Sequence, residues 1–405
     1  MKHRNTNFIL NESANYYQKA VQSDLMQVTI KGRKGKQVVM PDGSKVVEFI
    51  NCSYLGLDLH PKIVKASKVL DNSWGVNFCC ARSRFSIEPQ RELEEKLSSL
   101  FGGRAITFPS VTTTHVSVLP LIASGILLDA KYPPKVTIVF DRFAHSSTQY
   151  LKPILAQEAE IETIAHNDLE HLRRITVENK NRGRKVVYVA DGIYSMGGLC
   201  PIKELLSMAE ELDMYIYLDD AHGTSIFGQQ GEGPVLHELA EKRPKNLFIS
   251  FCLSKGFGCN GGGILLPTKK QELTVRTYGQ IYAFSAALDF SIVNACLEAI
   301  HLHKDGTVHK LQNKLRDNVA LYDSLMNLDL PFSPIRMIMI GNEDKAIEFC
   351  KSLLNQGFFT SVTFFPIVPR DKAQIRICIA ANHTTKQIKE LISAVKLIMN
   401  KMELI

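Results

Sequence analysis

Five short apolar runs, separated by longer stretches with helical spacing, constrain the fold of this chain most strongly. They lie at 104–108, 136–141, 185–191, 214–220 and 247–251. Short apolar runs rich in β-branched and aromatic residues are typical of strands that are buried on both faces, and the amphipathic segments between them are typical of crossover helices. This rhythm predicts an α/β fold in which helices cover both faces of a mainly parallel, doubly wound sheet.

The segments that flank this sheet have a different pattern. Alternating apolar and polar residues around two turn-like segments, between Val28 and Phe49, predict a small antiparallel meander. Beyond the sheet, a long amphipathic stretch is followed by strand-like and helix-like segments, which predicts a smaller α+β domain. We therefore expect an N-terminal arm and meander at 1–60, a large domain at 61–305 and a small C-terminal domain at 306–405.

Composition and charge narrow the class of protein. The 405 residues are 45% hydrophobic and carry a net charge of +7 that is spread along the chain. Because this charge is not gathered into one basic block, it does not indicate a nucleic-acid partner, and binding of anionic small molecules explains it equally well. We therefore expect no nucleic-acid partner. Nine cysteines occur without regular spacing, which predicts neither a disulfide framework nor a metal site.

No segment has the character of a membrane span or a signal peptide. Polar residues return immediately after Leu10, so we expect a cytoplasmic protein. The most apolar stretch, Val116 to Leu128, is interrupted by Pro120 and Gly125. It is also shorter than the roughly 20 residues that a membrane helix needs. We predict that it forms a buried helix.

Polar side chains gather where four of the predicted strands end. They occur in the segments 142–145, 192–198, 219–222 and 252–255. In open α/β sheets, functional residues collect beyond the carboxyl ends of the strands. We therefore expect these four segments to contribute to one site.

These segments contain groups that an enzyme using pyridoxal 5′-phosphate (PLP) requires. Such an enzyme needs a lysine for a Schiff base, an acid facing the pyridine nitrogen, a flat group over the ring and a cradle for the phosphate. Lys255, Asp219 and His145 are candidates for the first three. Taken singly, each has an ordinary explanation, as a surface lysine, a turn-capping aspartate and a hydrogen-bonded core histidine.

The sequence motifs in these segments resemble those of the α-oxoamine synthases, which are fold-type-I PLP enzymes. The resemblance covers nearly the whole chain, and its most specific part is LDDAHGTSIFGQQGEG at 218–233 followed by SKGFG at 254–258. Weaker matches are SYLGLDLHP at 53–61, FAHSS at 143–147, AHNDLEHL at 165–172, DGIYSMGGLCPIKEL at 191–205 and IRICIAANHT at 375–384. The resemblance implies a PLP-dependent acyltransferase that condenses an α-amino acid with an acyl-CoA or acyl-carrier thioester to an amino ketone.

The resemblance also implies a role for each matching residue. Lys255 would form the Schiff base and move the α-proton, and Asp219 would pair with the pyridinium. His222 and Ser195 would bind the 3′-oxygen, while His145 would stack on the ring near the thioester carbonyl. The phosphate would contact Ser110, Val111, Thr112 and Cys252. The resemblance also implies a homodimer with shared active sites, in which Ser285 of the neighbouring subunit would contact the phosphate. Arg376 would bind the substrate carboxylate.

Several departures from the family wording affect the predicted substrate. Cys52 stands where biotin-pathway members carry an asparagine, Ser254 replaces a glycine, and Val111 and His115 break the usual S-G-x-x-x-N wording. The bulky segment WGVNFCCARSRFSIEP at 74–89 replaces a glycine-rich one. These departures favour a lipid-like product, made by a sphingoid-base synthase or by an autoinducer synthase that produces a long-chain ketone signal in quorum sensing.

Three alternatives stay open. A plain aminotransferase shares the fold, but the histidine three residues after Asp219 and the K-G-F-G wording favour a synthase. Residues 256–261 fit the G-x-G-x-x-G fingerprint of NAD(P)-dependent oxidoreductases, but that fingerprint needs a following helix. The next residues, GGILLP, predict a strand that ends at Pro267. A non-catalytic cofactor-binding protein would not need all the proposed catalytic residues together.

Overall fold

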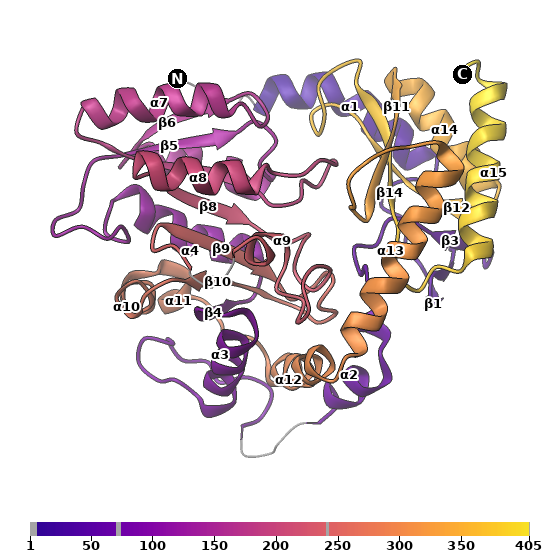
Figure 1. Cartoon of the computed structure of the whole chain (residues 1–405). Coiled ribbons are helices and arrows are strands. Elements are labelled where there is room, and N and C mark those ends of the chain that lie inside the picture. Colours follow the sequence, from indigo (N-terminus) through magenta and orange to yellow (C-terminus); the bar gives the residue numbers. More distant parts are fainter. Residues whose placement is uncertain (1–5, 70–73, 240–242, 405) are drawn as a thin grey trace. The chain divides into compact units, whose positions relative to one another are not determined.

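The computed structural model describes residues 6–69, 74–239 and 243–404, and the chain divides into two compact units (Figure 1). The small unit combines Met1–Gly56 with Leu311–Ile405, and the large unit is Leu57–Lys310. The N-terminal arm thus packs with the C-terminal part of the chain. The predicted division into 1–60, 61–305 and 306–405 stays a prediction, because compactness alone does not show that a part folds independently.

A seven-stranded sheet forms the centre of the large unit. Its strand order is β4-β10-β9-β8-β7-β5-β6, and all pairs are parallel except those that β10 makes with β4 and β9. The five apolar runs form five of these strands, which confirms the predicted α/β fold. The strands are β4 (Arg104–Phe108), β5 (Val136–Asp141), β6 (Glu160–Ile164), β7 (Lys185–Asp191), β8 (Tyr215–Asp219), β9 (Leu247–Cys252) and β10 (Gly262–Leu266).

Helices of the large unit pack against this sheet. Helix α4 contacts β9 and β10, and α7 contacts β7. Every residue of β5 and β9 is buried, as expected for strands covered on both faces. The helices are α2 (Pro61–Ala66), α3 (Glu88–Phe101), α4 (Val111–Ala123), α5 (Ser146–Gln149), α6 (Lys152–Leu155), α7 (Leu169–Asn181), α8 (Ile202–Leu212), α9 (Pro234–His237), α10 (Lys269–Tyr278), α11 (Gln280–Phe284) and α12 (Phe290–Lys304), after a 3₁₀ turn at Leu57–Leu59.

Helix α4 contains most of the apolar stretch that was predicted to be a buried helix. It begins earlier than predicted, at Val111, because Ser110 and Thr113 form a capping box at its start. It ends at Ala123, shortly before Gly125, whose φ of +78° favours glycine. Pro120 lies inside the helix without ending it.

The small unit contains two small sheets. One has the order β1-β2-β3-β12, and its first three strands form the predicted antiparallel meander. The other has the order β11-β14-β13. The strands are β1 (Gly32–Lys34), β2 (Gln37–Val39), β3 (Lys45–Glu48), β11 (Ile335–Gly341), β12 (Phe358–Phe359), β13 (Ser361–Thr363) and β14 (Ala373–Cys378). The helices are α1 (Thr6–Gln22), α13 (Thr307–Met326), which begins in the large unit, α14 (Glu343–Asn355) and α15 (Thr385–Lys401).

A buried ion pair stabilises the meander of the small unit. The Lys36 ammonium lies 2.8 Å from Glu48 Oε1, and the two side chains are 2% and 7% exposed. Glu48 Oε2 also accepts hydrogen bonds from the backbone amides of Ile50 and Asn51. The carboxylate therefore has several partners, which a buried charge requires.

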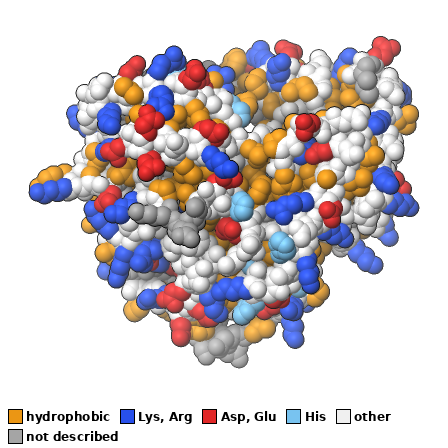
Figure 2. All heavy atoms as spheres, viewed as in Figure 1, with side chains coloured by type: hydrophobic (Ala, Val, Ile, Leu, Met, Phe, Trp, Pro, Cys, Tyr) orange, Lys and Arg blue, Asp and Glu red, His pale blue; other side chains and the backbone are white. Residues whose placement is uncertain are grey.

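Charges on the surface are mixed. On the face shown in Figure 2, Lys and Arg side chains are interspersed with Asp and Glu. Among the described residues, none of the helices combines the length and the apolar character that crossing a bilayer requires.

Candidate active site

The register of the central sheet brings the predicted segments to one edge. Asp191 at the end of β7 pairs with Asp219 at the end of β8, and β8 pairs in parallel with β9. Gly262 pairs with Cys252 at the end of β9 and with Phe108 at the end of β4. The residues that follow β4, β7, β8 and β9 therefore lie along the same edge of the sheet.

Asp219 is the most constrained side chain at this edge. It is 5% exposed. Its Oδ1 accepts hydrogen bonds from the Ala221 amide at 3.0 Å and the Ser250 hydroxyl at 3.1 Å. Its Oδ2 lies 3.1 Å from His115 Nε2. Because each carboxylate oxygen has two lone pairs, Oδ2 keeps one acceptor position, which fits the N–H of a pyridinium ring.

The buried aspartates at this edge have pKa values that are shifted in different directions. Burial would raise the pKa of Asp219, but His115, Lys255 and His145 together lower it below its usual range. Burial and then the negative charge of Asp219 raise the pKa of Asp191 and of Asp220 well above the usual range. A fourth buried aspartate at this edge, Asp141 at the end of β5, also has a lowered pKa, because hydrogen bonds from His166 and from backbone amides outweigh its burial. Its oxygens already accept from Phe143, His166, Asn167 and Tyr188, so Asp219 is the candidate pyridinium partner.

Lys255 lies in a tight turn directly after β9. The Gly258 amide donates to the Lys255 carbonyl, and Gly258 has a φ of +81°, which favours glycine. A side chain at Gly258 would also come within 2.4 Å of Leu57. The next residues form strand β10 instead of a helix, so the dinucleotide fingerprint lacks the helix that it needs.

His145 is the N-cap of the short helix α5 and is half-buried. Its backbone amide donates to Asp191 Oδ1 at 3.1 Å. Its Nδ1 lies 2.7 Å from the Ser147 hydroxyl and accepts a hydrogen bond from the Ser147 amide. A neutral ring with this pattern carries its proton on Nε2.

The start of α4 forms the predicted phosphate cradle. The capping box uses the amides of Ser110 and Thr113, and no hydrogen bond among the described residues uses the amides of Val111 and Thr112. Free amides at a helix start bind anions. A Cβ at Gly262 would come within 2.7 Å of the Val111 nitrogen, so glycine at this position leaves the cradle open. The residues present thus fit PLP at both its nitrogen and its phosphate.

Comparison with known proteins agrees with this geometry. Residues 81–395 match the family model described as aminotransferase class I and II. The chain belongs to this family.

Curated relatives and solved structures place the chain near the synthases of the family. The 8-amino-7-oxononanoate synthase of Thermoanaerobacter pseudethanolicus is 29% identical over 374 residues, 90% of each chain. The protein of the same name, numbered 1, from Bacillus subtilis is 27% identical and covers 89% of this chain and 90% of its own. A serine palmitoyltransferase from S. paucimobilis with a bound PLP–myriocin aldimine has a TM-score of 0.85 at 21% identity, covering 99% of this chain and 100% of that one.

These matches confirm four predictions. They are the fold-type-I architecture, the PLP cofactor, the α-oxoamine synthase resemblance and the class of PLP-dependent acyltransferase. The individual site residues stay predictions.

The other residues that are predicted to contact the cofactor lie at different places in the large unit. His222 is buried just after β8, and Ser195 lies in the turn after β7. The Cys252 thiol lies 3.1 Å from the Ser254 hydroxyl. Ser285 is the half-buried C-cap residue of α11, and its role toward a partner subunit stays a prediction.

Arg376 lies on β14 of the small unit. Its Nη2 is 3.6 Å from the Cys52 sulfur, and the thiols of Cys52 and Cys378 hydrogen-bond each other. The departure from asparagine at position 52 therefore lies directly beside the arginine that is predicted to bind the substrate carboxylate.

The bulky segment at 74–89 includes an arginine with a structural role. Arg82 donates to the Thr107 carbonyl at 2.6 Å and to Glu94 Oε1 at 2.7 Å. Glu94 also pairs with Arg276. Arg82 is thereby held inside the large unit, so Phe78 and Arg84, which are both exposed, are the better candidates for contact with a substrate.

The sequence analysis did not identify His115 and Ser250 as part of the site. His115 was noted only as a departure from the family wording. It lies four residues after Val111 on α4, a spacing that places both residues on one face of a helix. That spacing is the signal that could have linked His115 to the predicted phosphate contact of Val111.

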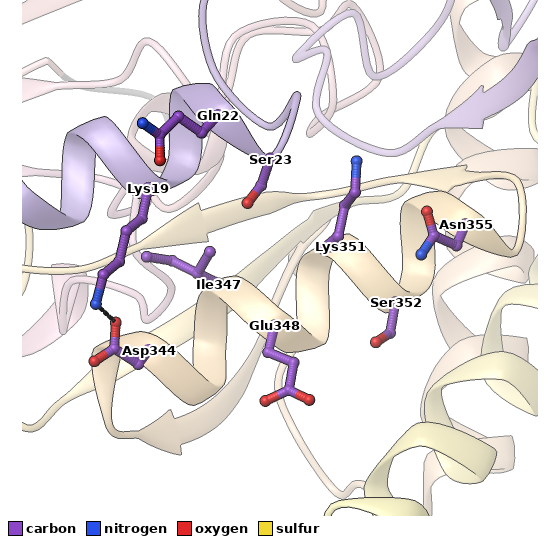
Figure 3. A pocket seen from close by; sticks show the side chains of 9 residues that line it. All are labelled: Lys19, Gln22, Ser23, Asp344, Ile347, Glu348, Lys351, Ser352 and Asn355. Carbon is purple, nitrogen blue, oxygen red and sulfur yellow. Dashed lines mark hydrogen bonds and ion pairs between the residues drawn. The ribbon is translucent and has the colours of Figure 1, made fainter.

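The pocket between α1 and α14 of the small unit is a separate feature (Figure 3). Lys19 and Asp344 form an ion pair across it, with atoms 2.6 Å apart. None of the predicted site residues lines this pocket.

Proposed function

We propose that this enzyme condenses an α-amino acid with an acyl-CoA or acyl-carrier thioester to form an amino ketone. The observation that carries the proposal is Asp219, a buried carboxylate whose pKa is lowered and whose Oδ2 keeps an acceptor position, at a sheet edge that also holds Lys255 and His145. The names of the relatives, 8-amino-7-oxononanoate synthase and serine palmitoyltransferase, support synthase chemistry.

Each of these residues would have a separate role around the bound cofactor. Bound PLP supplies an electron sink that makes the α-proton of the amino substrate acidic. Asp219 holds the pyridine N–H, and the amides of Val111 and Thr112 hold the phosphate. Lys255 would hold the cofactor and would accept the α-proton of the amino substrate on its amine.

The condensation forms one carbon–carbon bond and breaks one carbon–sulfur bond. The α-carbon of the amino substrate bonds to the thioester carbonyl carbon, and the thiolate leaves and takes up a proton. His145 would donate Nε2–H to the carbonyl oxygen as negative charge develops there. Loss of the substrate carboxyl group as CO₂ leaves an electron pair on the α-carbon, and return of the proton from Lys255 to this carbon gives the amino ketone.

The finer substrate assignment is a medium or long acyl chain, which gives a lipid-like product. It is supported by Cys52 beside Arg376 and by the exposed aromatic pair of Phe78 and Phe85, whose rings lie 6.4 Å apart. Each additional buried methylene contributes about 0.8 kcal/mol. A chain-binding site therefore predicts a steep rise of kcat/KM with acyl length.

An assay of matched acyl-CoA substrates tests the proposal. Purified protein with PLP is given each of the common amino acids and acetyl-, pimeloyl-, octanoyl- or palmitoyl-CoA. Released thiol is measured together with the mass of the product. We expect thiol release coupled to an amino ketone, fastest with the longer chains. Formation of a keto acid without consumption of the thioester would instead identify an aminotransferase.

A further inference from the structure

A buried polar cluster surrounds the carboxylate of Asp219. We define the Asp219 cluster as His115, Tyr217, Asp219 and Ser250. The first, second and fourth are 0% exposed, and Asp219 is 5% exposed. They come from α4, β8 and β9, so three elements of the large unit must be in place before the cluster forms.

His115 connects two members of the cluster. Its Nδ1 lies 2.8 Å from the Tyr217 hydroxyl and its Nε2 lies 3.1 Å from Asp219 Oδ2. The two rings meet edge to face, with centroids 5.6 Å apart. Since an ionised carboxylate only accepts hydrogen bonds, Nε2 must carry a proton and donate it toward Oδ2. Oδ2 is also the oxygen with the remaining acceptor position.

The charged and titratable groups around this contact come from several elements. Burial and the charge of Asp219 raise the pKa of Asp191 at the end of β7 and of Asp220 after β8. Lys255 after β9 and His145 before α5 also lower the pKa of Asp219. Of these groups, His115 is the fully buried one that contacts Asp219 Oδ2 directly.

The position of His115 links the two ends of the cofactor site. Val111 contributes a phosphate-binding amide on the first turn of α4, and His115 lies on the next turn of the same helix. A rotation of α4 would displace both contacts together. The helix thus fixes the distance between the phosphate cradle and Asp219 Oδ2.

We propose that His115 is a positioning residue that holds Asp219 ionised and aims its Oδ2 at the pyridine nitrogen of bound PLP. A hydrogen bond donated to a carboxylate weakens its pull on any other proton. With His115 in place, the shared proton stays on the pyridine nitrogen, where it strengthens the electron sink. Without this donor the proton moves toward Asp219. The inference rests on the PLP chemistry of the proposed function and not on the identity of the acyl substrate.

Reconstitution with PLP labelled with ¹⁵N at the pyridine nitrogen tests this role. In the wild-type holoenzyme, the ¹⁵N resonance should stay at the protonated position from about pH 6 to pH 9, because the nitrogen stays charged throughout. In His115→Leu, which removes the donor, the resonance should move toward the unprotonated position. In His115→Asn, which keeps an N–H donor, and in Tyr217→Phe, which keeps the imidazole, it should stay close to wild type.

Two further readouts separate positioning from loss of structure. In His115→Leu, kcat should fall by about 10- to 100-fold, the range typical of partners that orient a directly acting group, with KM for the amino substrate changed by less than about twofold. His303→Asn is the matched control, because His303 is another buried histidine of the large unit, bonded to Ala299 and Ser225. This control should leave the ¹⁵N resonance of the bound PLP unchanged.

The outcomes distinguish this inference from the proposed function. An unchanged ¹⁵N resonance in His115→Leu, or an equal shift in His303→Asn, would overturn the role of His115. If His115→Leu does not fold, the partly conservative His115→Asn and His115→Gln decide, and a resonance in both that matches an unprotonated nitrogen would also overturn it. A wild-type enzyme that shows the protonated resonance but forms no amino ketone would refute the condensation while leaving the inference intact.

Discussion

Asp191 and Asp219 are register partners on adjacent parallel strands, and their surroundings shift the pKa values of the two carboxyl groups in opposite directions. Burial and the charge of Asp219 both raise the pKa of the Asp191 carboxyl. Asp219 stays ionised because His115, Lys255 and His145 outweigh its burial. The strand register therefore places a carboxyl group with a raised pKa directly beside the carboxylate that is predicted to pair with the cofactor.

This relationship predicts that Asp191→Asn is tolerated and Asp219→Asn is not. The amide oxygen that Asp191→Asn introduces can still accept the hydrogen bond from the His145 amide, so kcat should remain within a few-fold of wild type. Asp219→Asn loses the pyridinium partner, and kcat should fall by at least about 100-fold, or roughly 2.7 kcal/mol of activation free energy. Steady-state kinetics of the two variants measures both kcat values. Equal losses would contradict the different roles assigned to the two carboxyl groups.

The same pKa shift predicts a pH-dependent stability for Asp191→Asn. The folded-state pKa of Asp191 is raised above the unfolded value of about 3.9, so its contribution to stability is present below that pH and is lost as the pH rises. Asparagine at this position has no such loss. The melting temperature of Asp191→Asn relative to wild type should therefore be higher at pH 7 than at pH 4, by differential scanning fluorimetry.

Arg376→Ala should weaken binding of the amino substrate without affecting PLP binding. Losing a charge-assisted contact to a carboxylate costs roughly 1.5–3 kcal/mol, which is about a 10- to 150-fold rise in the dissociation constant. Titration with the amino substrate, followed by the visible spectrum of the cofactor, measures this. Arg370→Ala is the control, since Arg370 is an exposed arginine of the same unit. Equal binding by wild type and Arg376→Ala would refute the role.

The buried ion pair of Lys36 and Glu48 should be a large contributor to the stability of the small unit. Lys36→Ala leaves the Glu48 carboxylate buried without its cation, which should lower the free energy of unfolding by about 3–5 kcal/mol. Lys36→Met combined with Glu48→Gln removes both charges and should recover part of this loss. Lys19→Ala breaks the exposed pair in Figure 3 and should change the value by less than about 1 kcal/mol. Urea denaturation measures all three, and similar losses for Lys36→Ala and Lys19→Ala would contradict the assignment.

The prediction of shared active sites leads to a complementation experiment. If Ser285 binds the phosphate in the neighbouring subunit, a heterodimer of Lys255→Ala and Ser285→Glu contains one intact site. Random mixing of the two inactive variants by mild dissociation and reassociation should restore roughly a quarter of wild-type activity, since half of the dimers would have one site of two intact. Mixed samples that stay inactive, although they form heterodimers in native mass spectrometry, would exclude this arrangement.

The sequence predicted the parts of the fold that depend on local pattern. The runs that form β5, β7, β8 and β9 are continuous and apolar, so both their position and their burial could be read directly. Strand β6 was missed because EIETI at 160–164 alternates charged residues, as befits a strand at the edge of the sheet. The grouping of the N-terminal arm with the C-terminal part was also missed, because it depends on the pairing of Val47 with Phe358 across a long stretch of chain.

The candidate site, like the fold, could be predicted only where it depends on local sequence pattern. Lys255, Asp219 and His145 could be proposed because each follows a strand, and strand ends meet at one edge of a parallel sheet. The contact of His115 with Asp219 joins residues about 100 positions apart in the chain, and it depends on the rotation of α4 over the sheet. The raised pKa values of Asp191 and Asp220 likewise follow from burial, which no local pattern reports.

The attachment of PLP to Lys255 is the central claim, and borohydride reduction tests it most directly. Reduction of the Schiff base in the purified holoenzyme fixes the cofactor to the lysine that holds it, and peptide mapping by mass spectrometry then locates it. We predict the reduced cofactor on Lys255, with loss of both the visible absorbance and the modification in Lys255→Ala. Reduced cofactor on any other lysine of the wild-type enzyme would contradict this assignment.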